Sequence, residues 1–254
     1  MARLIIIVQN TIKEGLRKKF LPGLLFFCFV ILVFSLFLGQ LSINEKKRIT
    51  IDFGLAGIQI TLSALSVLLG SVFISGDLEQ RTIWAVLSRP VRPSVFFLGR
   101  FLGITSLIFL ALCALSLTLT SFFFYLDVSI SLTLFQALFG FFLESILLLA
   151  FVLFFFNFIT AFLVPFYCLG IFVIGHWLDS LLYLTKKGTG VFVGIFPYII
   201  NIFPNLEYGN WKTAVVYGDT ISGGDFSMAV LYFLLWIGCI LSLSLFLFER
   251  KDFL

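Results

Sequence analysis

Long apolar runs separated by short polar segments recur along this chain from residue 21 to residue 248. A helix of about 20 apolar residues is long enough to cross the hydrocarbon core of a bilayer, and it satisfies its own backbone hydrogen bonds there. The pattern therefore predicts an all-α polytopic membrane protein. Its six predicted transmembrane helices cover residues 21–41, 53–75, 96–126, 131–156, 159–183 and 227–248.

Chain length, rather than charge, separates the fourth span from the fifth. From Val128 to Tyr183 the charged residues are Glu144 and Asp179 alone. A continuous helix of these 56 residues would be about 84 Å long at 1.5 Å per residue, whereas the hydrocarbon core is about 30 Å thick. Two spans are therefore expected here, with a turn near residues 157–160.

The first 20 residues predict an amphipathic helix that lies in the membrane interface. Apolar side chains recur at helical spacing at Ile5, Val8, Ile12 and Leu16, and charged side chains occupy the other face. A helix with this pattern lies along the interface and does not cross the membrane. It could anchor the topology, contact a partner, or do both.

A longer connection, residues 184–226, precedes the last span. Its apolar stretch from Val191 to Phe203 has 13 residues, which is too short to span a bilayer as a helix. The length favours a re-entrant or interfacial segment.

The distribution of Lys and Arg predicts the orientation. Eleven of the 17 lie in the N-terminal segment, in the polar insertion through Arg100, and at the C-terminus. Because basic residues are enriched on the cytoplasmic side, both termini and the insertion are expected to be cytoplasmic, and residues 184–226 extracytoplasmic. The lack of a basic stripe with interleaved aromatics argues against nucleic-acid binding.

Composition gives one membrane domain, residues 1–254. The chain is 61% hydrophobic and 12% charged, which is about half the charged fraction of a soluble domain. The four cysteines all fall in apolar runs, at spacings that match neither a disulfide framework nor a metal site.

The densest polar segment on the predicted cytoplasmic side is residues 76–95. Asp77 and Gln80 have the spacing of a helix N-cap and its reciprocal partner, and Pro90 ends the helical pattern. The pattern predicts a short helix between two spans. Arg and Trp are residue types enriched at binding hot spots, so this helix, which includes Trp84, could contact a partner. An interfacial helix anchored by Trp84 would have the same pattern.

This insertion resembles the permease subunits of ABC-2-type ATP-binding-cassette transporters. In that family an acidic residue precedes a Gly-Thr or Arg-Thr pair, and a leucine-rich helix, a Ser-x-Pro-Val-x-Arg-like turn and a Gly-Lys or Gly-Arg start of the third span follow. Pro93 stands near where an arginine often sits, and residues 248–253 also resemble the family's C-terminal tail. The matching residues here are Glu79, Arg81, Thr82, Leu87, Ser88, Arg89, Pro90, Val91, Arg92, Phe97, Leu98, Gly99, Arg100 and Gly103.

The resemblance implies partners more than chemistry within this chain. A cytoplasmic ABC ATPase subunit would dock under residues 76–95 as a coupling helix and would bind ATP and Mg. A second permease copy or a paralogue would complete the path through the bacterial cytoplasmic (inner) membrane, with membrane lipids around it and an extracytoplasmic accessory protein as a further partner. The expected ATPase contacts are Asp77, Glu79, Arg81, Thr82, Trp84, Leu87, Arg89 and Arg92.

No bound cofactor and no enzymatic activity are expected of the chain itself, because no Gly-x-x-x-x-Gly-Lys-Ser/Thr run is present. The expected function is that of the permease subunit of an ATP-driven exporter, which couples ATP hydrolysis by a separate ATPase subunit to substrate translocation or to conformational signalling across the membrane. The alternatives are a secondary transporter or channel that works without ATP, which typically has internal repeats and a charged midplane site, and a non-transporting membrane scaffold.

Several polar and small residues lie within the predicted spans. A carboxylate such as Glu144 costs about 2.5–3.5 kcal/mol at a helix centre on insertion scales, so it should face a partner or a cavity, in a structural role or in transport and gating. Gly99 and Gly103 permit close helix approach, within the chain or at a dimer seam. His176 and Asp179 share a helical face and are interpreted as a satisfied interfacial pair.

Overall fold

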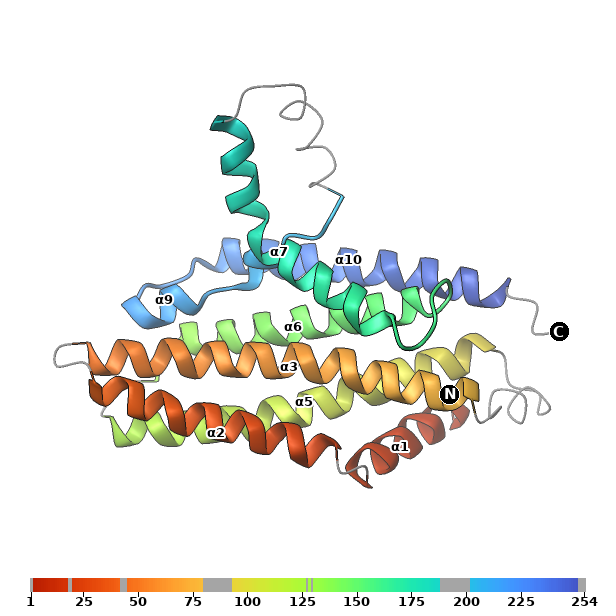
Figure 1. Ribbon diagram of the computed structural model, residues 1–254, viewed down its shortest axis with the longest axis horizontal. Coiled ribbons are helices and arrows are strands. Elements are labelled where there is room, and N and C mark those ends of the chain that lie inside the picture. The colour runs from red at the N-terminus through yellow and green to blue at the C-terminus, as the bar shows by residue number, and fades with distance from the viewer. Residues whose placement is uncertain are drawn as a thin grey trace.

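The computed structural model describes residues 2–17, 20–41, 45–79, 93–126, 128, 130–187 and 202–250. Within these residues every regular element is a helix (Figure 1). The elements are α1 (Ala2–Arg17), α2 (Phe20–Leu41), α3 (Lys46–Glu79), α5 (Pro93–Tyr125), α6 (Leu132–Phe155), α7 (Val164–Lys187), the 3-10 helix η1 (Leu206–Gly209), α9 (Lys212–Tyr217) and α10 (Gly223–Glu249).

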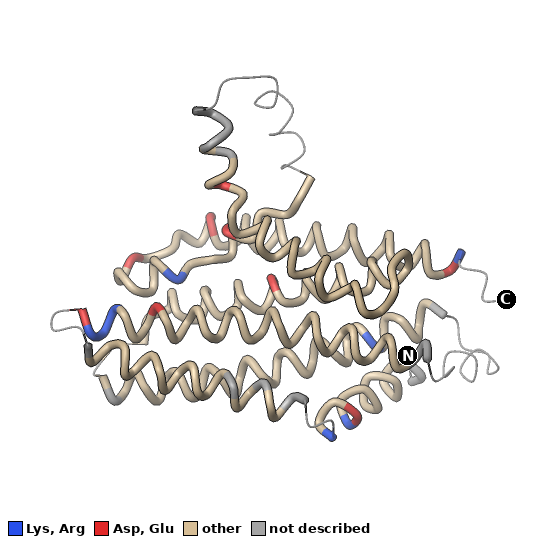
Figure 2. The backbone as a smooth tube through the Cα atoms, in the orientation of Figure 1, with Lys and Arg blue, Asp and Glu red and all other residues tan. Residues whose placement is uncertain are grey.

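Five of these helices, α3, α5, α6, α7 and α10, are long and apolar enough to cross a membrane. The protein is therefore an all-helical, multi-pass membrane protein, as the apolar runs predict. α2 has 22 residues and carries no charged side chain. The charged residues gather toward the two ends of the bundle, which suits its crossing a bilayer (Figure 2).

Several helix ends differ from the sequence prediction. α3 begins at Lys46, seven residues before the predicted span, and continues through Glu79. Asp77 is therefore in the last turn of α3 and is not the N-cap of a separate helix. The predicted ends come from hydropathy, which marks only the part of a helix inside the hydrocarbon core. The helix itself continues into the interface on both sides.

The turn between α6 and α7 covers residues 156–163, which includes the turn predicted near residues 157–160. The amide of Asn157 bonds the carbonyls of Leu153 and Phe154 at 3.1 and 3.2 Å, so it satisfies acceptors that the end of α6 leaves free. Pro165 occupies the first turn of α7, where its missing N–H has no helical partner to lose. α7 consequently starts at Val164, five residues later than the predicted span.

α3 and α6 form the centre of the bundle, each 72% buried over its apolar window. α2 and α5 pack against α3, α10 packs against α6, and α7 contacts both central helices. In Figure 1 the long helices run side by side, whereas the second half of α7 bends away from the bundle. α6 is buried on nearly all sides along residues 143–153, as expected of a helix without a polar face.

α1 docks on the first turns of α5 through small side chains and one ion pair. A β-carbon on Gly99 would meet Ile7, and one on Gly103 would meet Thr11, so both glycines let α1 approach closely. Arg100 bonds Glu14 at 2.9 Å and the Thr11 hydroxyl at 3.1 Å. Of the two predicted roles for these glycines, the structure shows packing within the chain.

The predicted apolar face of α1 packs only in part, because Ile12 contacts the hydrophobic core. Ile5 and Leu16 are about half exposed, and Thr11 is fully buried. The helix therefore has two faces. One face, with Ile7 and Thr11, contacts the glycines of α5, and exposed apolar side chains on the other are available to lipid, which agrees with an interfacial helix.

The connection before α10 inserts η1 among α6, α7 and α10. Leu206 is fully buried, and a β-carbon on Gly140 of α6 would collide with the carbonyl oxygen of Gly209. The backbone N–H of Asn205 donates to the Tyr232 hydroxyl at 2.7 Å. Residues 191–201, the greater part of the predicted re-entrant stretch, lie outside the described residues.

Gly103→Ala tests the docking of α1. The new methyl group would meet the β-carbon of Thr11 at 2.5 Å, and that carbon cannot turn away because it is bonded to the backbone of α1. We expect the free energy of unfolding to fall by about 1–3 kcal/mol, the usual cost of overpacking. Denaturant titration in mixed micelles measures it.

The matched control is Gly238→Ala in α10, where an added β-carbon meets nothing within 4 Å. Equal stability of the two variants would show that the bundle does not depend on close approach of α1 and α5.

Candidate functional site

A cluster of polar side chains lies at the contact of α3, α6 and α7. α3 contributes Gln59 and Ser63, α6 contributes Glu144, and α7 contributes His176. Glu144 is 0% exposed, and Gln59 and Ser63 are buried as well. We call these four residues the polar cluster.

Hydrogen bonds connect all four members. The amide nitrogen Nε2 of Gln59 lies 2.8 Å from Oε2 of Glu144 and 2.8 Å from Nε2 of His176. The Ser63 hydroxyl donates to Oε1 of Glu144 at 3.2 Å, and Nε2 of His176 lies 3.7 Å from the same oxygen. One amide group therefore joins three helices that are far apart in sequence.

The backbone fixes the tautomer of His176. Its Nδ1 lies 3.0 Å from the carbonyl oxygen of Phe172, which can only accept, so Nδ1 carries the hydrogen. In the neutral ring Nε2 is then an acceptor and takes one amide hydrogen of Gln59, while the other amide hydrogen goes to Glu144. The structure thus shows a carboxyl group with two donors, and an imidazole that shares one of these donors with it.

The polar cluster lies deep in the bundle. Glu144 is the thirteenth of the 24 residues of α6, so it is roughly 17 Å from either helix end at 1.5 Å per residue. Figure 2 accordingly shows an acidic position midway along α6. Lys212 of α9 also acts electrostatically on Glu144.

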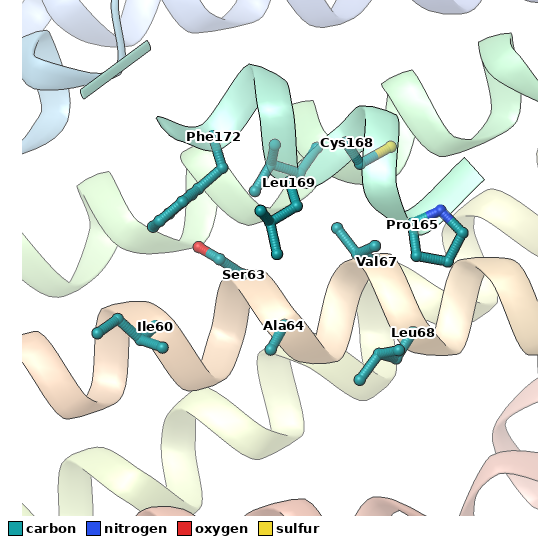
Figure 3. A pocket seen from close by; sticks show the side chains of 10 residues that line it. Ile60, Ser63, Ala64, Val67, Leu68, Pro165, Cys168, Leu169 and Phe172 are labelled. Carbon is teal, nitrogen blue, oxygen red and sulfur yellow. The ribbon is translucent and has the colours of Figure 1, made fainter. Parts of the chain in front are cut away.

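An apolar pocket of about 200 Å³ lies beside the polar cluster, between α3 and α7. Figure 3 shows Ile60, Ala64 and Val67 of α3 across from Leu169 and Phe172 of α7, with the Ser63 hydroxyl pointing toward α7. Ser63 also bonds Glu144, and Phe172 holds His176. The pocket and the polar cluster therefore share Ser63, and Phe172 connects the pocket to His176.

The predicted site residues separate into three groups. Glu144 has the partners that its position requires. His176 and Asp179 are not paired as predicted, because Asp179 accepts a hydrogen bond from Asn205 at 3.0 Å and His176 turns to Gln59. Two residues that share a helix face can each form a hydrogen bond with a neighbouring element instead of with each other.

The predicted ATPase contacts fall largely beyond the described residues. Asp77 and Glu79 lie in the last turn of α3, whereas Arg81, Thr82, Trp84, Leu87, Arg89 and Arg92 lie outside the part of the chain that the structure describes.

Sequence reasoning missed Gln59 and Ser63. A signal was present, because the two polar residues are spaced by four in an otherwise apolar run and therefore share one helix face. Polar residues inside a span usually face protein or a cavity, but their partners on α6 and α7 have no sequence signature.

Among the described residues no group of three or more His, Cys, Asp or Glu side chains is placed to hold a metal ion. No model of a known protein family matches this chain, and no curated protein matches it. The functional argument therefore depends on the residues themselves and on their geometry.

Gln59→Leu tests the linkage in the polar cluster. It leaves Glu144 and His176 without the donor they share, and we expect a loss of about 2–4 kcal/mol in the free energy of unfolding. In the double variant Gln59→Leu with Glu144→Leu the buried carboxyl is also gone, so the loss should be smaller than in the single variant. Denaturant titration in mixed micelles measures both.

Gln40→Leu, at an exposed position of α2, is the control and should change stability by less than about 0.5 kcal/mol. Additive effects of the Gln59 and Glu144 substitutions would mean that the two side chains are not coupled.

Proposed function

We propose that this chain is the membrane-spanning permease subunit of an ATP-driven transporter of the ABC-2 type. The observation that carries the proposal is the arrangement at one end of the bundle. The ring of Phe97 of α5 packs at a tilt against that of Phe248 of α10, with centroids 5.1 Å apart, and Arg100 of α5 pairs with Glu14 of α1. The charged segment with the ABC-2-like motif joins α3 to α5 at this same end.

Because α1, α3, α5 and α10 have ends in this region, it is a suitable binding site for a soluble ATPase subunit. An ATPase bound under residues 76–95 would act on α3 and α5 directly, and through the start of α5 on α1 and on the end of α10. The chain lacks a phosphate-binding run of its own, so ATP and Mg would be held by that partner. Export is the direction that the resemblance favours.

The finer topology belongs to the same proposal. It comprises six transmembrane helices, with α2 as the first, and both termini on the cytoplasmic side, where most of the Lys and Arg residues lie. A second permease copy or a paralogue would complete the path in the bacterial inner membrane. The connection with η1 and α9 would then face the outside, where an accessory protein could bind.

A second candidate function is an ATP-independent secondary transporter. The polar cluster favours it, because a titratable site near the bilayer midplane is typical of such proteins. The two candidates differ in whether an ATPase subunit belongs to the complex. A non-transporting scaffold would tolerate replacement of Glu144 but not of Trp84 or Arg81.

Affinity purification of the tagged protein from its native membrane in mild detergent tests the proposal. We expect an ABC ATPase subunit to be recovered in stoichiometric amount, identified by mass spectrometry. Recovery of the chain alone, under conditions that preserve a known ABC complex, would favour the self-contained transporter.

Replacing Glu79 and Trp84 together with Ala tests the coupling segment. In the reconstituted complex we expect ATP turnover to fall to the rate of the ATPase subunit without its permease, because the contact that transmits motion is lost, while membrane insertion is unchanged. ATPase assays in proteoliposomes and a membrane-fraction blot measure the two effects.

A matched control replaces an exposed acid and an exposed aromatic residue at the opposite end, Glu45→Ala with Tyr217→Ala. Unchanged ATP turnover and partner binding in the Glu79 and Trp84 variant would exclude a coupling role for this segment.

A further inference from the structure

We propose that Glu144, Gln59 and His176 form a proton-binding site inside the membrane, which holds one proton shared between the Glu144 carboxyl and the His176 imidazole. The inference goes beyond the ATP-driven function. It needs no ATPase partner, so either proposal can fail while the other stands.

The balance of charge at the site favours a proton as its ligand. An ionised carboxylate in an apolar interior is costly unless it is paired, and here its donors are the neutral groups of Gln59 and Ser63. Among the described residues, the imidazole lies 3.7 Å from the carboxyl and can bring a positive charge to it. One bound proton makes the Glu144 and His176 pair neutral, which removes most of the charge penalty.

The geometry does not suit a larger cation. Glu144 is 0% exposed, and the described residues place no third His, Cys, Asp or Glu side chain beside the pair. A proton needs no cavity and no further ligands.

The proton can occupy either partner. When it is on His176, the ring carries N–H bonds at both nitrogens and Glu144 is a carboxylate. Transfer breaks the Nε2–H bond, leaves the electron pair on the nitrogen, and forms an O–H bond on Oε1 of Glu144. The pair is neutral overall before and after the transfer, and the proton itself enters from and returns to water.

The hydrogen bonds of Gln59 depend on which partner holds the proton. In the structure its amide nitrogen donates to both Glu144 and His176, which requires an unprotonated Nε2. A hydrogen on Nε2 would point at another N–H donor, so the contact must break, or the amide must rotate to present its oxygen. Because Gln59 belongs to α3 and His176 to α7, proton loading changes how these two helices are joined.

α7 is the helix that can move when the proton changes the Gln59–His176 contact. Its apolar window is 28% buried, compared with 72% for α3 and α6, and the apolar pocket lies between it and α3. A change in the Gln59–His176 contact therefore acts on a helix that few other contacts hold in place.

Two other charged groups face this region: Lys212 of α9, which acts on Glu144, and Asp179 of α7, which lies three residues from His176. The remaining charged groups on the packed elements lie toward the helix ends. By element they are Asp52 and the terminal residues Lys46, Lys47, Arg48, Asp77 and Glu79 of α3, Arg100 of α5, Lys186 and Lys187 of α7, Glu207 of η1, and Asp225 and Glu249 of α10.

Infrared difference spectroscopy of the protein in lipid nanodiscs, titrated with acid and base, tests the proposal. We expect a carbonyl stretching band of a protonated carboxylic acid that changes with pH and is lost in Glu144→Gln. In His176→Gln the same band should titrate at a different pH, because its partner can no longer hold the proton.

Asp179→Asn is the matched control, since Asp179 is an exposed carboxylate three residues from His176. It should leave the band and its titration unchanged. If Glu144→Gln does not fold, carbon-13 labelling of glutamate side chains in the native sequence identifies the band. Glu144 is the one buried glutamate among the described side chains, so its band should resist rapid deuterium exchange.

Two results would overturn the proposal. One is the absence of a protonated Glu144 band at every pH at which the protein stays folded. The other is a Glu144 band whose titration is the same with and without His176, which would make the carboxyl an isolated structural group.

Discussion

The hydrocarbon core of a bilayer offers polar groups no hydrogen-bond partners, and the rest of this structure depends on that constraint. Backbone groups meet it by forming helices. Serine and threonine side chains meet it locally, as where Ser145 bonds the Phe141 carbonyl at 2.7 Å and Thr118 bonds that of Leu115 at 2.7 Å. The carboxyl of Glu144 has no such local solution on α6, and it must find its partners on other helices.

That requirement makes the polar cluster more than one contact among many. The apolar contacts of α7 allow sliding, because lipid tails and leucine side chains are nearly equivalent surroundings. A carboxyl, an amide and an imidazole with defined donors and acceptors fit in few arrangements. The polar cluster therefore specifies how α3, α6 and α7 sit together, and the same bonds let the site respond to a proton.

Close backbone approach supplies the second kind of specificity. Gly99 and Gly103 receive α1, and Gly140 receives the backbone of η1 at Gly209. The first contact joins α1 to the start of α5. The second attaches the connection before α10 to α6, one turn from Glu144. Packing of small residues therefore adds to the hydrogen bonds of the polar cluster in fixing the helices.

The sequence by itself determined the fold class, the order of the membrane helices and the depth of Glu144, because partition into lipid depends on local composition. It placed helix ends less well, as at Lys46 and Glu79, since helices continue past their apolar part. Only the tertiary structure decided that Gln59 meets His176, 117 residues away, and that Gly103 receives α1. Such pairs depend on how whole helices pack, and no local pattern records the partner on another helix.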